Sequence, residues 1–183
     1  TEREGLPNNA VTSLCVAHDG SVWVGTRGGV ARYGMTGWVY HSDWGGAKAP
    51  GGTKLARDSD GELWAAAGDV IYRLGDTSWR ENHRLRATRP GRIVDLVLAR
   101  DSTLWMATSW QILRRGDGGW REIGVSENGL EDPIGSICPG DRYLWAGTRN
   151  GAYRFDGTRW EAHPLDAPAN ESMERDGGTE EDP

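Results

Sequence analysis

Apolar and polar residues alternate over short segments between Val11 and His41, and this pattern predicts four strands. We expect the strands over residues 11–17, 22–26, 30–33 and 38–41. Pairs such as Asp19-Gly20 separate them and are signals for tight hairpin turns. Strands this short, with turns this frequent, are typical of a four-stranded antiparallel meander.

The same pattern returns three more times at an almost constant spacing. One series of tryptophans recurs once in each unit, and a second series follows it at a fixed offset. Such self-similarity indicates units that bury their apolar faces only against their neighbours. The sequence therefore predicts an all-β propeller with four blades of four-stranded antiparallel sheets, at about residues 5–44, 45–85, 86–125 and 126–164. The two series are Trp23, Trp64, Trp105 and Trp145, then Trp38, Trp79, Trp120 and Trp160.

Two charged residues recur in every unit as well. An aspartate precedes the first tryptophan by about four positions and an arginine follows it by nine. We interpret both as structural, because an active site needs a group once whereas a scaffold needs it in every repeat. The aspartate is expected to bond amides of its own turn, and the arginine to pair with a carboxylate or with carbonyls of the adjoining blade. The residues are Asp19, Asp60, Asp101 and Asp141, then Arg32, Arg73, Arg114 and Arg154.

Two of the units resemble a known repeat family. The segments GLPNNAV (5–11) and DGSVWVGTRGGVARY (19–33) look like the two-component regulator propeller repeat, and LWAGTRNGAYRFDG (144–157) is similar to it. The resemblance implies a ligand-sensing propeller of the kind found in bacterial hybrid sensor kinases and other regulators. It also implies a periplasmic or other extracytoplasmic location.

The number of repeats does not determine how the ring is closed. Four units could form a small closed ring, half of an eight-bladed ring made with a second copy, or a fragment of a larger ring. An open half-ring exposes the tryptophan-lined faces of its terminal blades, a kind of apolar patch that soluble monomers avoid. We therefore expect closure or pairing. The second unit is degenerate, and its residues 52–58 predict a poor strand.

The net charge of −6 belongs to one end of the chain. Of the 27 acidic and 21 basic residues, seven and one lie from Asp166 onward, so the rest of the chain is balanced. Residues 166–183 are acidic and without periodicity, which predicts a disordered tail. A neutral body gives no electrostatic footprint for nucleic acid, and no apolar run is long enough to insert into a membrane.

The two cysteines occupy nearly the same place in the first and last units. Cys15 lies eight residues before Trp23, and Cys138 lies seven before Trp145. We interpret them as small apolar residues of the blade interior, with a disulfide between the first and last blades as the alternative.

Departures from the repeat mark the candidate binding surface. Connections between blades and turns between second and third strands are expected on one side of the disk, which we call the loop face. Exposed aromatic residues beside arginine and asparagine are suited to stacking on a sugar or gripping a peptide. The alternative is that Trp44 and Trp110 cover a gap left by the degenerate second blade. The candidates are Trp44, Trp110, Arg27, Arg149, Asn150, Asp69, Arg86 and Arg89.

The sequence shows no catalytic constellation. The four histidines have neither metal-ligand spacing nor a motif beside them, so no metal, cofactor or catalytic residue is predicted. Streptogramin B lyases also carry Asp-Gly-x-Leu-Trp repeats, but the aromatic-Thr-Glu continuation that follows them is absent here. We therefore expect a non-catalytic recognition or sensor propeller that binds a small molecule, glycan or peptide. The alternatives are a structural interaction module that assembles with a second copy or a larger partner, and a propeller lyase.

Overall fold

The computed structural model describes residues 1–44, 52–86, 91–125 and 129–164. Apart from the short 3-10 helix η1 (Glu2–Glu4), its regular elements are strands. None of the helices in these ranges is long and apolar enough to cross a membrane. The first two sheets contain β1 (Val11–Val16), β2 (Val22–Thr26), β3 (Gly29–Gly34), β4 (Gly37–His41), β5 (Lys54–Arg57), β6 (Leu63–Ala67), β7 (Val70–Leu74) and β8 (Trp79–Arg84). The last two contain β9 (Ile93–Leu98), β10 (Leu104–Thr108), β11 (Ile112–Gly116), β12 (Gly119–Ile123), β13 (Ser136–Pro139), β14 (Leu144–Gly147), β15 (Gly151–Phe155) and β16 (Trp160–Pro164).

Each group of four consecutive strands forms one antiparallel sheet in chain order, and we call these sheets blades 1 to 4. The predicted all-β architecture with four-stranded blades is confirmed. The register is the same in every blade: the first-series tryptophan on the second strand lies directly opposite the repeated arginine on the third, as Trp23 does with Arg32. The predicted tail from residue 166 onward lies outside the described residues.

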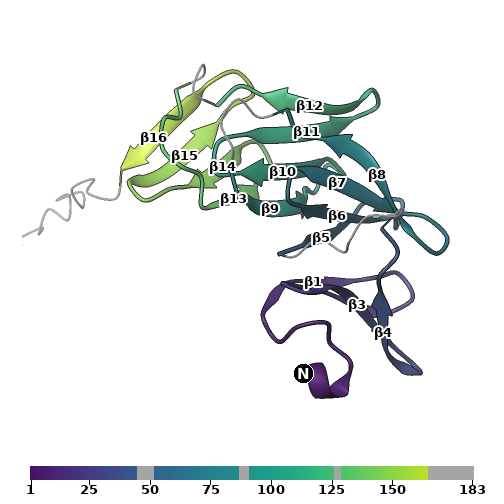
Figure 1. Ribbon diagram of the computed structural model, residues 1–183. Coiled ribbons are helices and arrows are strands. Elements are labelled where there is room, and N and C mark those ends of the chain that lie inside the picture. The colour runs from purple at the N-terminus through teal and green to yellow at the C-terminus, as the bar shows by residue number, and fades with distance from the viewer. Residues whose placement is uncertain (45–51, 87–90, 126–128, 165–183) are drawn as a thin grey trace, which may run out of the picture.

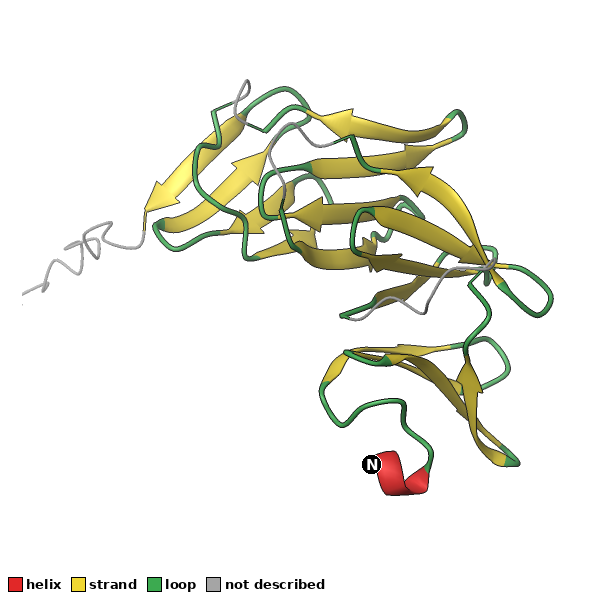
Figure 2. Cartoon of the chain, in the orientation of Figure 1, coloured by secondary structure: helices red, strands yellow, loops and turns green. Residues whose placement is uncertain are grey.

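The four blades form an open arc (Figures 1 and 2). The innermost strands β1, β5, β9 and β13 contact one another in that order, and no comparable contact joins β13 to β1 within the described residues. Blades 1 and 4 therefore stand at the two ends of the arc. The closed four-bladed ring is wrong for a single copy of this chain, whereas an arc is compatible with part of a larger ring.

The hydrophobic core consists of three layers, one between each pair of neighbouring blades. Because side chains alternate along a strand, each blade has two faces. We call the face that carries Trp23, Trp64, Trp105 or Trp145 the forward face, and the face that carries Trp38, Trp79, Trp120 or Trp160 the backward face. In every layer the forward face of one blade packs on the backward face of the next.

The two tryptophan series meet at these layers. Trp23 of blade 1 lies edge-on to Trp79 of blade 2, with ring centroids 5.9 Å apart. Trp64 of blade 2 meets Trp120 of blade 3 in the same way, also at 5.9 Å. Edge-to-face rings at this distance attract each other beyond their hydrophobic burial. The regular spacing of the tryptophans in the sequence therefore reflects a contact that is repeated in the first two layers, and in the third layer Trp105 and Trp160 belong to the same core cluster.

The repeated charged residues have mostly local, structural partners. The Asp19 carboxylate accepts a hydrogen bond from the Ser21 amide at 3.0 Å and pairs with Arg32 at 2.5 Å. Among the other arginines, Arg73 pairs with Glu62 at 2.9 Å and Arg154 pairs with Glu161. Arg114 instead donates to the Thr103 hydroxyl at 3.4 Å. These partners account for the recurrence of the arginines without hydrogen bonds to carbonyls of an adjoining blade.

In the turn of blade 2 the expected role has moved to a different aspartate. Asp58 is buried and accepts hydrogen bonds from the amides of Asp60 and Glu62 and from the indole nitrogen of Trp64, the last at 2.8 Å. The side chain of Asp60, which occupies the repeated position, is exposed. The prediction that the repeated aspartate orders its turn is therefore wrong for Asp60.

The degenerate start of blade 2 forms a strand after all. Leu55 and Ala56 of β5 are buried, and the Leu55 amide donates to the Ser13 hydroxyl of blade 1 at 3.0 Å. Contacts with blade 1 thus override a weak local pattern. Both cysteines are free, so the alternative of a Cys15–Cys138 disulfide is not realised in this structure. Cys15 is half-buried, but Cys138 is exposed, so the interpretation as a residue of the blade interior is wrong for Cys138.

Candidate axial binding pocket

Turns and connections gather on one face of the arc, as the repeat predicts. The turn between the second and third strands of blade 1 is bonded to both neighbouring connections: the Arg27 amide donates to the Ala10 carbonyl, and the Gly52 amide donates to the Thr26 carbonyl. In blade 3 the equivalent turn does the same, since the Ser109 amide donates to Arg92 and the Ile134 amide donates to Ser109. These hydrogen bonds fix the backbone of the loop face.

A pocket of about 690 Å³ opens on this face at the inner strands. Its walls come from the starts of β1, β5 and β9, from the turns after β2 and β6, and from the connections that lead into blades 2, 3 and 4. It therefore lies at the axis around which the blades are arranged, and we call it the axial pocket. Its lining residues are Thr12, Arg27, Gly52, Lys54, Gly68, Gly91, Arg92, Ile93, Val94 and Gly135.

Every charged side chain in that lining is a cation. Arg27, Lys54 and Arg92 come from blade 1, blade 2 and the connection to blade 3, so three successive units each contribute one. None of the three makes an ion pair with a carboxylate of the described residues. Three unneutralised positive charges around one hollow attract an anion, and the two guanidinium groups can bind a carboxylate or phosphate bidentately.

The positions of these cations are set by backbone contacts. Lys54 follows Thr53, whose carbonyl accepts hydrogen bonds from the hydroxyls of Thr12 and Ser13 at 2.7 and 3.0 Å. The carbonyl of Arg92 accepts a hydrogen bond from the Ser109 amide at 2.9 Å. Gly91 leaves room for this contact, because a Cβ there would lie 3.0 Å from the Thr108 hydroxyl. The backbone that carries these long side chains is therefore held in place by hydrogen bonds.

Glycine supplies four of the ten lining residues of the axial pocket. Glycine leaves backbone groups uncovered by side chains, so a ligand can approach the main chain closely. The remaining walls are apolar, from Ile93 and Val94, or carry the Thr12 hydroxyl. The pocket thus combines cations, accessible backbone and a small apolar surface.

Two of the three cations of a second hollow, Arg100 and Arg114 but not Arg142, already have partners among the described residues. This hollow, of about 420 Å³, lies between blades 3 and 4 beside the turns after β9, β13 and β15, on the side away from the loop face. There Arg100 pairs with Asp141 at 2.9 Å, and the Arg114 guanidinium lies 5.6 Å from the centre of the Trp105 ring. Three carboxylates, Asp101, Asp141 and Asp156, line this hollow and offset its positive charge, so we take the axial pocket as the candidate site.

Trp44 does not belong to the predicted binding surface, because its side chain is buried. It is 2% exposed, its ring stacks on Trp79 at 5.0 Å, and it lies edge-on to Tyr72 at 4.8 Å. Its indole nitrogen donates to the His41 carbonyl. The side chain therefore fills the layer between blades 1 and 2, where a flat apolar ring gains most from burial, and the interpretation of an exposed binding aromatic is wrong.

The other sequence candidates that the structure describes lie on the loop face but are spread over it. Trp110 is half-buried in the turn after β10, and Arg149 and Asn150 are exposed in the equivalent turn of blade 4. Asn150 donates to Asp132 at 2.6 Å. Asp69 is bonded to Arg84 at the outer strand, Arg86 is exposed, and Arg89 lies outside the described residues. Of the seven candidates among the described residues, only Arg27 lines the axial pocket.

Sequence reasoning missed Lys54 and Arg92. The sequence candidates were loop residues that break the repeat, whereas the axial pocket is lined by the starts of three inner strands, by two turns and by the connections between blades. One signal was present: Lys54 occupies the position that Ser13, Asp95 and Ser136 hold in the other blades.

The described residues do not bring metal-binding groups together. They contain no cluster of three or more His, Cys, Asp or Glu side chains that could hold a metal ion. His41 and His163 each lie against a tryptophan ring of the same blade, at 4.4 and 5.2 Å. Both imidazole rings therefore take part in side-chain packing within their own blades.

Comparison with known proteins places the first unit in a family. Residues 5–28 match the family described as two component regulator propeller. Residues 5–28 are therefore similar to a two component regulator propeller repeat. The repeat covers the approach to blade 1, its strands β1 and β2, and the turn that carries Arg27, so one of the three pocket cations belongs to it. No curated protein sequence matches the chain.

Solved structures share the fold at low sequence identity. The extracellular domain of a putative hybrid two component system from B. thetaiotaomicron is 14% identical, with a TM-score of 0.75, over 90% of this chain and 26% of that one. Virginiamycin B lyase from Staphylococcus aureus is 19% identical, with a TM-score of 0.68, over 90% of this chain and 59% of that one. A gluconolactonase from Xanthomonas campestris is 15% identical, with a TM-score of 0.61, over 84% and 61%. The chain therefore spans from about a quarter to three fifths of the proteins that it resembles.

Proposed function

We propose that this chain is a non-catalytic recognition unit of a sensor propeller and that it binds an anionic small molecule or the carboxylate of a peptide or acidic sugar in the axial pocket. The observation that carries the proposal is the group of three cations without carboxylate partners, Arg27, Lys54 and Arg92, around a glycine-lined hollow. The two component regulator propeller repeat at residues 5–28 and the fold shared with an extracellular sensor domain support the sensor role. They also support an extracytoplasmic location.

The lyase alternative has less support from the geometry. The lyase and the gluconolactonase share the fold at only 19% and 15% identity, and a shared propeller fold does not carry a reaction with it. Within the described ranges, the axial pocket lining contains no histidine, carboxylate or cysteine. Of the side chains that commonly transfer protons in catalysis, the described lining contains Lys54 alone, without a second acid or base beside it.

The proposal is tested by calorimetric titration of the chain with citrate, glucuronic acid and inorganic phosphate at pH 7 and low salt. We expect at least one of these anions to bind, with an affinity that falls as ionic strength rises. Because a charge-assisted hydrogen bond contributes about 1.5–3 kcal/mol, Lys54→Gln or Arg92→Gln should each weaken binding by roughly 10-fold or more.

Arg149→Gln is the matched control. It removes one exposed cation from the loop face without touching the axial pocket, so it should leave the affinity within about 2-fold of the original, as expected for an exposed charge outside the site. Failure of all three anions to bind would overturn the proposal. Equal weakening by Arg149→Gln and Lys54→Gln would do so too, since it would indicate diffuse attraction by net charge.

A further inference from the structure

At each end of the arc, one tryptophan of the repeated contact has no tryptophan of another blade opposite it among the described residues. Trp23 and Trp64 each meet a second-series tryptophan of the following blade, and Trp105 shares a core layer with Trp160. Trp145 of blade 4 has no following blade among the described residues, and its ring neighbour is His163 of its own sheet. At the other end, the Trp38 ring of blade 1 lies 4.9 Å from the Tyr33 ring of its own sheet, and Gly5 packs against its side chain, but no other blade among the described residues meets it.

The exposed fraction of the side chain at one position of the inner strands shows that blade 1 lacks a preceding blade among the described residues. Leu55, Leu96 and Ile137 stand at the same place on β5, β9 and β13, and each is 5% exposed because the preceding blade covers it. Leu14 stands at that place on β1 and is 66% exposed. Val16, Tyr33 and Tyr40 extend this exposed surface over the backward face of blade 1.

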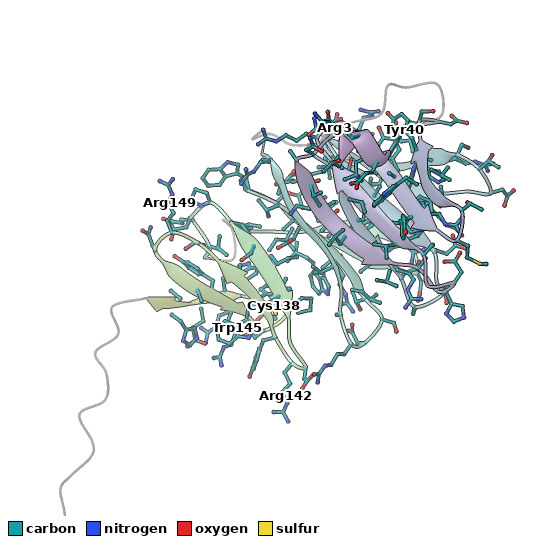
Figure 3. All side chains as sticks on the ribbon, turned by 90° about the horizontal axis from the view of Figure 1, so that it is seen from below. Arg3, Tyr40, Cys138, Arg142, Trp145 and Arg149 are labelled. Carbon is teal, nitrogen blue, oxygen red and sulfur yellow. The ribbon has the colours of Figure 1, made fainter. Side chains whose placement is uncertain are left out.

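A polar contact repeats in the same manner. The Ser13 hydroxyl of blade 1 accepts a hydrogen bond from the Leu55 amide of blade 2 at 3.0 Å. The Asp95 carboxylate of blade 3 accepts one from the Ile137 amide of blade 4, also at 3.0 Å. Ser136 occupies the equivalent position on blade 4 and is exposed on the forward face, near the also exposed Cys138. Figure 3 shows Cys138 and Trp145 on this last sheet, far from the first sheet with Tyr40.

We propose that two copies of this chain associate head to tail, with the forward face of blade 4 in each copy packed on the backward face of blade 1 in the other, to close a ring of eight blades. The occupant is a second copy because the two free faces are those that join blades within the chain: a tryptophan and a hydrogen-bond acceptor on one, a leucine and a tryptophan on the other. One such contact alone would leave the remaining pair of faces exposed, whereas two contacts related by a twofold axis cover both pairs. This inference goes beyond ligand binding in the axial pocket and does not depend on it.

The first test is the mass of the full chain in solution, by light scattering on a size-exclusion column over a range of concentrations. We expect a species of twice the chain mass of 20.1 kDa that dissociates on dilution. A monomer at every concentration would overturn the proposal and would leave these faces to other blades of a longer polypeptide. A series of growing oligomers would overturn it as well, because head-to-tail contacts that do not close make open filaments.

The second test uses exposed residues, so that the variants keep their fold. Leu14→Glu places a charge on the backward face of blade 1, and Cys138→Glu places one on the forward face of blade 4. Each alone should convert the pair to monomer, because each face occurs in both contacts. Met35→Glu, at an exposed turn of blade 1 outside both faces, is the control and should remain a pair.

The two variants also distinguish the arrangement. If only one of Leu14→Glu and Cys138→Glu abolished the pair, the copies would be joined through the same face of each, and the head-to-tail ring would be overturned. Loss of the pair in Met35→Glu as well would indicate association by net charge and would likewise overturn the proposal. Circular dichroism of each variant confirms that the sheets are intact.

Discussion

Blade 1 and blade 2 are opposites in sequence and in packing. Blade 1 contains the match to the two component regulator propeller repeat, yet several of its large apolar residues, such as Leu14 and Val16, are exposed. Blade 2 has the most degenerate sequence, yet Leu55, Trp64 and Trp79 are buried in it. The difference follows from position in the array, because blade 2 has a neighbour on both faces and blade 1 on one.

This comparison shows that agreement with the repeat pattern and contribution to stability are separate quantities. A blade of a repeat protein is stabilised by its own strands and by the contacts with its neighbours. Blade 2 compensates for a weak strand pattern with two core layers. Blade 1 has a strong pattern and one layer, so the same substitution should have different effects in the two blades.

Trp79→Ala should cause the largest loss of stability of the changes considered for these blades. Trp79 is fully buried and contacts both Trp23 and Trp44, and truncation of a buried aromatic costs about 3–5 kcal/mol. Trp38→Ala removes the same residue from the same position of blade 1, where it is half-buried, and should cost clearly less. Urea denaturation of both variants, run below the concentration at which copies associate, measures the two changes in the free energy of unfolding. Equal losses would contradict the explanation from position.

Asp58→Ala should cost about 3 kcal/mol, because it leaves two backbone amides and the indole nitrogen of Trp64 without their acceptor in a buried turn. The matched control is Asp60→Ala in the same turn. Its side chain is exposed, and its removal should change the free energy of unfolding by less than about 0.5 kcal/mol. The comparison is made by urea denaturation, and a larger loss for Asp60→Ala than for Asp58→Ala would show that the repeated position orders the turn after all.

The sequence was sufficient to predict the blades, because their signals are local. Alternating residues, turn pairs and the two tryptophan series each depend on a few neighbouring positions, and the strands appear where these patterns lie. The role of Asp60 was predicted wrongly because the pattern records which residue recurs, whereas the fold selects the carboxylate that can reach the turn. Asp58, two positions earlier, reaches the Trp64 indole at 2.8 Å.

The candidate site was less predictable, because it depends on distances between units. Trp44 breaks the repeat and was therefore taken for a surface aromatic, but an irregular connection can also fold inward to fill a layer, and here it does. Lys54 differs from the residues at its position in the other blades, but a repeat alignment does not show that it lies near Arg92. They acquire meaning only when the arc places them around the same pocket as Arg27, and the curvature of the arc cannot be read from one unit.

The contact between blades 1 and 2 should also depend on pH through His41. Its ring lies 4.4 Å from the Trp23 ring, and its buried Nε2 atom has no hydrogen-bond partner among the described residues. Burial, with the nearby Arg32 guanidinium, lowers the pKa of His41 below its usual value of 6.5. The folded state therefore favours the neutral imidazole, and the unfolded state binds the proton more readily. The stability that depends on the neutral imidazole is fully present above about pH 6.5 and is lost as the pH falls from there through the lowered pKa.

Melting temperatures measured from pH 7.5 to 5.0 should fall more steeply for the original chain than for His41→Phe. Parallel curves would show that this imidazole is not titrating between the blades.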